Sequence, residues 1–401
     1  MILLIALALI FARVFGYLFF LLKQPAVIGE IIAGFFLGAI GLIAFSGDLF
    51  SFDISFSLSF IDYNAEQFKL LAEIGILFML FLSGLQTNFS KLKKSGKVSF
   101  FVAVGGAIVP LLLGFIVSLF FFSWEVSVVL GLILTATSVG VTIRSLMDIQ
   151  RLDTDVGTVI LGGAVIDDVI GILLLTFILG IHSIYDAVWV SLRIVIFFFI
   201  FLYIGLKIID KILDLGEKIH LPKAFLSISL SILLLYAYFA DRAGMAGIIG
   251  AFVAGLLIGQ TVRSRKILDD VQAIGLGFFI PLFFVWVGAG LWNGLYNYFD
   301  SILSVGLVAL FIIFVAIIGK IIGCGIGAKI GGMNNLESLQ IGIGMIPRME
   351  IALIITSAVI SRGLLKSSEI EHQILTITVL LTIVTTVITP FLIKAVFKKE
   401  Q

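Results

Sequence analysis

The chain has 401 residues, of which 61% are hydrophobic and only 13% are charged, and its mean hydropathy is +1.23. That composition excludes a soluble globular protein, and a formal net charge of +1 gives no reason to expect nucleic acid or another strongly charged partner. Repeated apolar runs of about 20 residues, each long enough for a hydrocarbon core of about 30 Å, predict an all-α polytopic membrane protein.

Thirteen transmembrane spans are predicted. In chain order they cover residues 1–22, 26–45, 66–86, 96–122, 125–147, 155–181, 185–212, 222–240, 243–261, 271–295, 300–328, 336–361 and 371–397. Lysine and arginine gather in alternate loops, beginning with Lys23, whereas the opposite loops contain Arg242, Arg362 and Lys366. The positive-inside rule therefore predicts an external N-terminus, a cytoplasmic C-terminus and a location in the plasma or inner membrane.

A short motif recurs along the chain. Gly29 and residues 33–38 match Gly250 and residues 254–259, which lie 221 positions later. If spans 1–6 repeat as spans 8–13 with span 7 as a linker, the two six-helix units have opposite topology, which is a common transporter design. The alternative is chance recurrence of the small residues that pack membrane helices together.

Polar segments interrupt the fifth span of each unit. Residues 135–142 contain four hydroxyl side chains and a glycine, and residues 342–350 contain two glycines and Pro347. Because glycine weakens a helix and proline removes a backbone donor, both helices are expected to break near the membrane centre. The freed carbonyls and hydroxyls can then replace water around a small cation.

Two adjacent carboxylates, Asp167 and Asp168, lie in the middle of the almost uncharged segment 156–181. A charge at the bilayer midplane costs about 2.5–3.5 kcal/mol on insertion scales, so the pair indicates bound ions or protons. Neighbouring helix residues point about 100° apart, so one carboxylate is expected to face the interrupted helices and the other a cationic side chain. Lys320 is the best candidate for that partner, and its snorkelling to the membrane surface is the alternative.

These residues suggest ion exchange. Desolvation raises the proton affinity of a carboxylate and a nearby lysine lowers it, so such a cluster can exchange protons for metal cations. Competition for one site that opens to one side at a time couples the two fluxes without covalent chemistry or a cofactor. Arg348 and Glu350 are expected to be supporting charges in ion pairs near the second interruption, and Arg13 and Glu30 to snorkel toward the cytoplasmic surface.

Five pieces of the sequence carry a family resemblance. They are residues 24–30, 135–138 and 165–168, Lys320, and residues 347–350. With these pieces, in this order, the chain resembles the sodium/proton antiporters of the NhaA and NapA type, in the branch that also holds Kef-type potassium/proton antiporters. NapA-type proteins are the most similar because they also have thirteen spans and a paired Asp-Asp.

The resemblance implies an NhaA-like fold in which the whole chain, residues 1–401, is one membrane transport domain. Residues 1–86 and 222–295 would form a scaffold that makes a homodimer. Residues 96–181 and 300–397 would form a transport core that moves like an elevator. Residues 185–212 would connect the two parts.

The resemblance also implies roles for individual residues. Asp168 would bind sodium, and Asp167 would pair with Lys320 and release a proton when the pair breaks. Thr137 and Ser138 would line the site. Two protons per sodium would make transport electrogenic. One departure from the pattern is Met349, where many relatives have glycine between the arginine and the glutamate.

Three other functions fit parts of the sequence. Potassium/proton exchange of the Kef type would use the same fold. An organic-anion symporter could share the inverted repeat but would not need the Asp-Asp-Lys set. An intramembrane aspartyl protease needs two aspartates on different helices, which the adjacent pair does not supply. The sequence therefore predicts a transporter of monovalent cations and protons, in contact with membrane lipid, rather than an enzyme.

Overall fold

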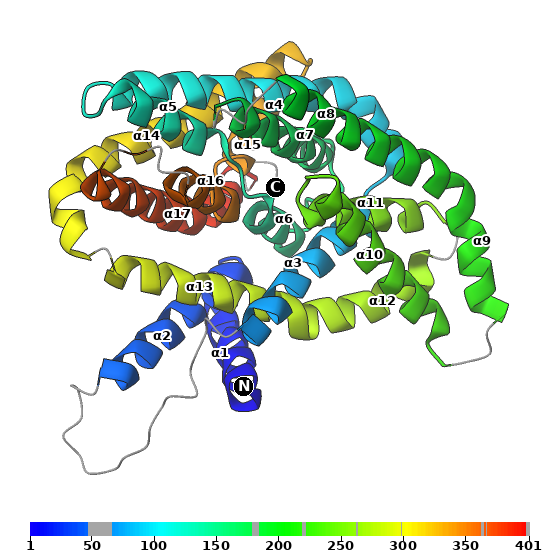
Figure 1. The fold of residues 1–401 in the computed structure, drawn as a ribbon. Helices are drawn as coiled ribbons and strands as arrows, with labels where there is room; N and C mark the ends of the chain where they lie inside the picture. Colours follow the sequence, from blue (N-terminus) through cyan, green and yellow to red (C-terminus); the bar gives the residue numbers. More distant parts are fainter. Residues whose placement is uncertain are drawn as a thin grey trace, which may run out of the picture.

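The computed structural model describes residues 1–46, 66–178, 184–218, 222–261, 264–297, 299–361, 365 and 367–397, and all regular secondary structure in these ranges is helical (Figure 1). The helices of the first half are α1 (Ile2–Leu21), α2 (Ala26–Ser46), α3 (Glu66–Gln86), α4 (Phe89–Ser118), α5 (Trp124–Thr135), α6 (Val139–Asp148), α7 (Asp155–Ile178), α8 (Ile184–Phe197), the π-helical segment η1 (Phe198–Ile204) and α9 (Gly205–Lys218). Those of the second half are α10 (Ala224–Arg242), α11 (Gly247–Gly259), α12 (Ser264–Ile274), the π-helical segment η2 (Gly275–Phe279), α13 (Ile280–Asn297), α14 (Phe299–Ile330), α15 (Asn335–Gly344), α16 (Glu350–Ser361) and α17 (Ser368–Phe397).

The length and apolar character of these helices make the molecule a polytopic membrane protein. Within the described residues, eight helical segments are long and apolar enough to cross a membrane. A ninth is present if Leu192–Tyr203 and Gly205–Asp214, which meet at an angle of 45°, count as one span. Ala26–Ile40 and Gly247–Gly259 are shorter apolar helices. The total of thirteen crossings remains a prediction.

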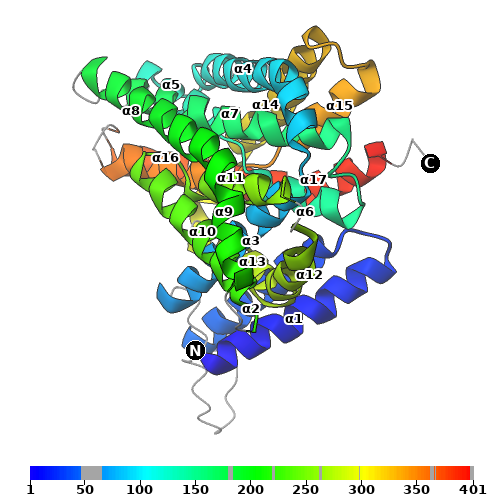
Figure 2. The same ribbon diagram turned by 90° about the vertical axis from the view of Figure 1, so that its right-hand side faces the viewer.

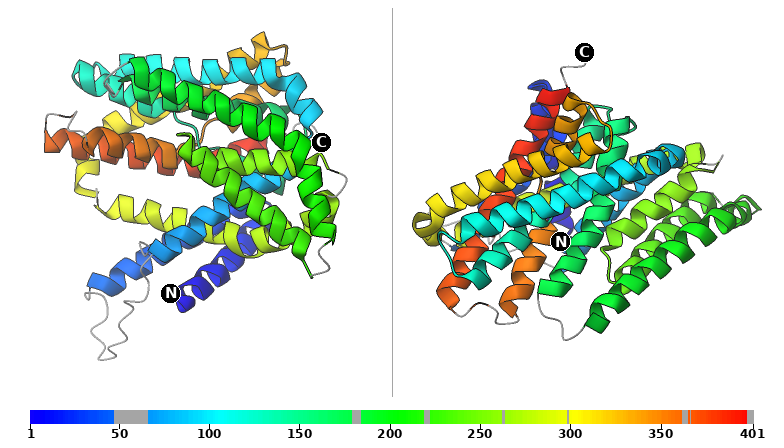
Figure 3. Two further views of the ribbon diagram at one scale, coloured as in Figure 1. Left: turned by 45° about the vertical axis from the view of Figure 1, so that its right-hand side comes forward. Right: turned by 90° about the horizontal axis from the view of Figure 1, so that it is seen from above.

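The helices form two groups (Figures 1 and 3). Group I consists of α1–α3 and α10–α13, and group II consists of α4–α7 and α14–α17. In Figure 2, α8 and α9 run along the outside of both groups. Helix α6 lies at the boundary, where it contacts α2 and α3 of group I as well as α7 and α17 of its own group. The two groups therefore meet through this short half-helix and through α17, which contacts α13 and α2.

Glycines set the closest helix contacts in group I. A Cβ atom added to Gly34 of α2 would overlap the backbone carbonyl of Val285 on α13. The same is true of Gly255 on α11, where an added Cβ would overlap the carbonyl of Phe81 on α3. Small residues at such points let membrane helices approach backbone to backbone. This close approach matters because helices in a membrane associate through van der Waals packing and not through the hydrophobic effect.

Both predicted interruptions are present in group II. Helix α5 ends at Thr135 and α6 begins at Val139, while α15 ends at Gly344 and α16 begins at Glu350. The connecting stretches meet, because the backbone N–H of Ser138 donates to the carbonyl of Pro347 at 2.7 Å. The contact satisfies backbone groups that each broken helix leaves without an intrahelical partner.

Candidate functional site

The carboxylate of Asp167 lies in the interior of group II and has two partners. Its Oδ2 atom is 3.0 Å from Lys320 Nζ on α14, and Thr137 Oγ1 donates to the same oxygen at 2.5 Å. Lys320 is 0% exposed and Asp167 is 3% exposed. The snorkelling alternative for Lys320 is therefore wrong, because its ammonium group forms a buried ion pair. Asp167 Oδ1 is buried and has no hydrogen-bond partner in the described part of the chain.

The packing of α4 against α14 leaves room for the lysine. A Cβ atom added to Gly106 of α4 would lie 3.3 Å from Lys320 Nζ and still closer to the sulfur of Cys324. Cys324, one turn after Lys320, is fully buried against this glycine. A larger residue at position 106 would therefore overlap the Cys324 sulfur first and crowd the ammonium group of Lys320.

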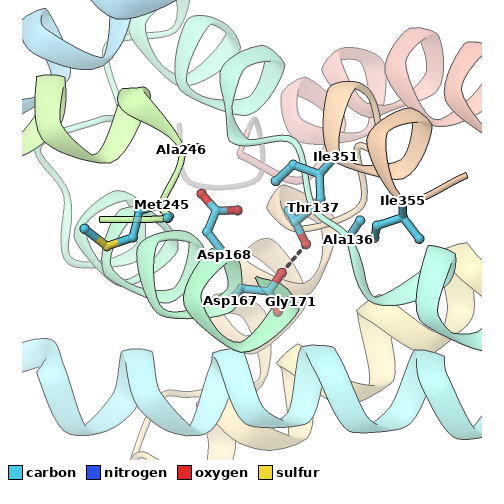
Figure 4. Close-up of a pocket in the computed structure, with 10 residues that line it drawn as sticks. Ala136, Thr137, Asp167, Asp168, Gly171, Met245, Ala246, Ile351 and Ile355 are labelled. Atoms are coloured by element: carbon cyan, nitrogen blue, oxygen red, sulfur yellow. Dashed lines mark hydrogen bonds between the residues drawn. The ribbon is translucent and has the colours of Figure 1, made fainter. Parts of the chain in front are cut away.

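Asp168 occupies a different environment. A cavity of about 170 Å³ separates it from group I, and the cavity lining combines polar residues of group II with the turn between α10 and α11. The lining residues are Ala136, Thr137, Asp167, Asp168, Gly171, Gly244, Met245, Ala246, Ile351 and Ile355. Figure 4 shows the Asp168 carboxylate pointing into this space between Met245 and Thr137, while Asp167 is bonded to Thr137.

The two aspartates divide much as the sequence argument expected, which gave one carboxylate to the interrupted helices and the other to a lysine. Asp167 pairs with Lys320, and Asp168 points into the cavity that Ala136 and Thr137 of the first interruption line. One contact was not expected, because Asp167 also accepts a hydrogen bond from Thr137. Thr137 also lines the cavity, and Ser138 is fully buried at the start of α6.

Arg348 is fully buried in the second interruption, and within the described residues its guanidinium group donates to backbone carbonyls. Its Nη2 atom donates to Leu134 O at 2.9 Å and to Ala316 O at 3.2 Å, and Nη1 donates to Ile346 O. The last carbonyls of a helix carry partial negative charge, so the guanidinium group stabilises the C-terminal end of α5. The expected supporting charge is therefore present, but it acts on the backbone. The side chain of Glu350 lies outside the described residues.

Sequence reasoning missed a second buried charge cluster, at the boundary between the groups. Arg144 on α6 lies 3.4 Å from Glu30 Oε1 on α2 and 3.2 Å from Asp148 Oδ1. Backbone N–H groups of Ala26 and Val27 at the start of α2 also donate to the Asp148 carboxylate. Glu30 is 1% exposed, so its expected snorkelling to the surface is wrong. The available signal was the Arg144–Asp148 pair, spaced four residues apart in a half-helix.

Comparisons with known proteins cover almost the whole chain. Residues 4–399 match the family model described as sodium/hydrogen exchanger, transmembrane. The Na(+)/H(+)-K(+) antiporter GerN of Bacillus cereus is 33% identical over 98% of this chain and 95% of its own length. The Na(+)/H(+) antiporter of Enterococcus hirae is 32% identical over 94% of this chain and 92% of its own.

A solved structure has the same fold. The sodium proton antiporter MjNhaP1 of Methanocaldococcus jannaschii superimposes with a TM-score of 0.62 over 98% of this chain and 97% of that chain, at 22% sequence identity.

Proposed function

This chain belongs to the transmembrane sodium/hydrogen exchanger family, and we propose that it is a secondary active antiporter that exchanges cytoplasmic sodium for external protons. The family is one of membrane transporters, not enzymes. The observation that carries the proposal is the pair of buried carboxylates with different partners, Asp167 with lysine and threonine, and Asp168 beside a cavity.

The two carboxylates would have separate roles. Asp168 binds the sodium ion, and Thr137 and Ser138 supply further oxygen atoms at the first interruption. When the site is reshaped around the ion, the Asp167–Lys320 pair opens and releases a proton. Two protons per sodium would move one net charge, so a membrane potential would contribute about 2.3 kcal/mol per 100 mV to transport.

Matching turns support an inverted repeat. Between α1 and α2, the N–H groups of Lys23 and Gln24 donate to the carbonyls of Phe20 and Phe19. Between α10 and α11, 221 positions later, the N–H groups of Gly244 and Met245 donate to the carbonyls of Asp241 and Ala240. Lys23 and Gly244 both have positive φ, at 55° and 87°. Turns of this kind also end other helices of the chain, at Gln150 and Gly332, so the support comes from the shared offset of 221 residues.

The helix contacts support the division of labour expected from the family. Residues 1–86 and 222–295 form the scaffold, which corresponds to group I. Residues 96–181 and 300–397 form the transport core, which corresponds to group II, and residues 185–212 link them. The core would move against the scaffold like an elevator, in a homodimer with an external N-terminus and a cytoplasmic C-terminus.

Transport in proteoliposomes tests the proposal. Sodium added to vesicles with an imposed proton gradient should collapse that gradient with the wild-type protein but not with Asp168→Asn. Asp155→Asn is the matched control, because it makes the same chemical change at an exposed position on the same helix. Normal exchange by Asp168→Asn would refute the site assignment, and an imposed potassium diffusion potential would reveal electrogenic transport.

Potassium/proton exchange is the second candidate. GerN carries potassium in its name and aligns with nearly the whole chain. Collapse of the proton gradient by potassium alone would select this function over sodium exchange.

A further inference from the structure

Gly171 leaves an open space beside the two aspartates. It lies on α7, four residues after Asp167 and three after Asp168, so it shares their side of the helix one turn further along. Gly171 lines the same cavity as both carboxylates. A Cβ atom built at Gly171 meets no atom within 4 Å. Helix packing therefore does not require a glycine at this position, and the space beside Gly171 is part of the cavity.

The cavity has room for water but few protein ligands. Its volume of about 170 Å³ is enough for several water molecules. Among the described lining residues, those with side-chain oxygens are Thr137, Asp167 and Asp168, and the Thr137 hydroxyl already donates to Asp167. Methionine, alanine and isoleucine side chains supply most of the remaining wall. The described side chains offer a cation beside Asp168 few oxygen ligands besides those of Thr137 and the two aspartates, so we expect the ion to keep part of its water shell.

We propose that Gly171 is a specificity-determining residue, whose missing side chain leaves room beside Asp168 for the retained water and so lets the site accept potassium as well as sodium. This inference rests on the proposed antiport function. Selectivity between cations of one charge depends on cavity size, ligand number and flexibility. A cavity that holds water adapts to a larger ion more easily than a closed cage of protein oxygens.

Gly171→Ala is the direct test. We expect the ratio of potassium-driven to sodium-driven exchange to fall by about tenfold, the low end of what one methyl group decides in a binding pocket. Gly306→Ala on α14 is the matched control, because its Cβ atom also meets nothing within 4 Å but lies outside the cavity. Alanine is more favourable than glycine inside a helix by about 1 kcal/mol, so both variants should fold.

Gly171→Ser provides a second measurement, because its hydroxyl group fills the same space but can replace a water ligand. We expect sodium exchange by this variant to persist while the potassium ratio falls. An unchanged ratio in both variants, with sodium exchange still abolished by Asp168→Asn, would overturn the role of Gly171 and leave the antiport function intact. A wild-type protein that rejects potassium would also overturn it. Absence of exchange with either ion would instead refute the antiport function.

Discussion

Breaking the buried ion pair between Glu30 and Arg144 should strongly lower the free energy of unfolding. The pair joins α2 of group I to α6 of group II, and both side chains are at most 7% exposed. Arg144→Gln would remove the positive charge that faces both Glu30 and Asp148. Removing one partner of a buried ion pair typically costs about 3–5 kcal/mol, because the remaining charge has neither water nor a counter-ion. Glu30 Oε2 already lacks a hydrogen-bond partner in the described residues, which argues for the upper part of that range.

The assay is the free energy of unfolding in mixed detergent micelles. Lys91→Gln is the control, since Lys91 lies at the same 3.4 Å from Asp153 but the pair is 42% and 67% exposed. An exposed pair contributes at most about 1 kcal/mol. The double variant Glu30→Gln with Arg144→Gln should recover part of the loss, because it leaves no charge at position 30. Equal losses in Arg144→Gln and Lys91→Gln, or strict additivity in the double variant, would refute the reasoning.

Three further substitutions test other contacts. Lys320→Met should lower the yield of folded protein, measured by size-exclusion chromatography, because Asp167 stays buried without its counter-ion. Adding Asp167→Asn should restore that yield but should not restore exchange, measured by vesicle transport. Thr137→Val removes a buried hydroxyl donor without changing the shape of the side chain, so unfolding should become easier by about 1–3 kcal/mol, whereas Thr137→Ser should stay close to wild type in the same titration. Gly34→Ala should abolish stable folding, seen as loss of the monodisperse peak, because α2 cannot move away from α13 without breaking their contact; a normal peak would show that the helices can separate.

The sequence predicted features that depend on local chemistry. The interruption at Pro347 follows from its missing N–H group, and the polarity of residues 135–142 marked the matching break. The pairing of an aspartate with Lys320 was predictable because an isolated buried lysine in an apolar span needs a counter-ion. Helix geometry alone did not say which aspartate pairs with Lys320, because both lie on one turn and the position of α14 decides. The family resemblance implied Asp167, which is the partner observed.

Long-range partners were the main omission. Glu30 and Arg144 are 114 positions apart, and each lies near a helix end, where a long polar side chain ordinarily reaches the surface. Their burial results from the approach of the two helix groups at α6, which no local pattern encodes. Arg348 was expected to pair with acidic side chains, but the broken helices expose carbonyls that are closer and equally in need of a donor.

The surroundings of the two matching turns explain why Asp168 suits a cation and Asp148 does not. The turn at Gly244–Ala246 faces Asp168, and the turn that contains Lys23 faces Asp148, across a cavity of about 640 Å³. Asp148 is already neutralised by Arg144 and by N–H groups at the start of α2, and Lys23 and Lys394 line its cavity. A cation would be repelled there. At the other turn the described lining contains no basic residue, and the nearby Lys320 is paired with Asp167. Related backbone turns thus meet carboxylates in opposite electrostatic settings, and this difference favours Asp168 as the site of exchange.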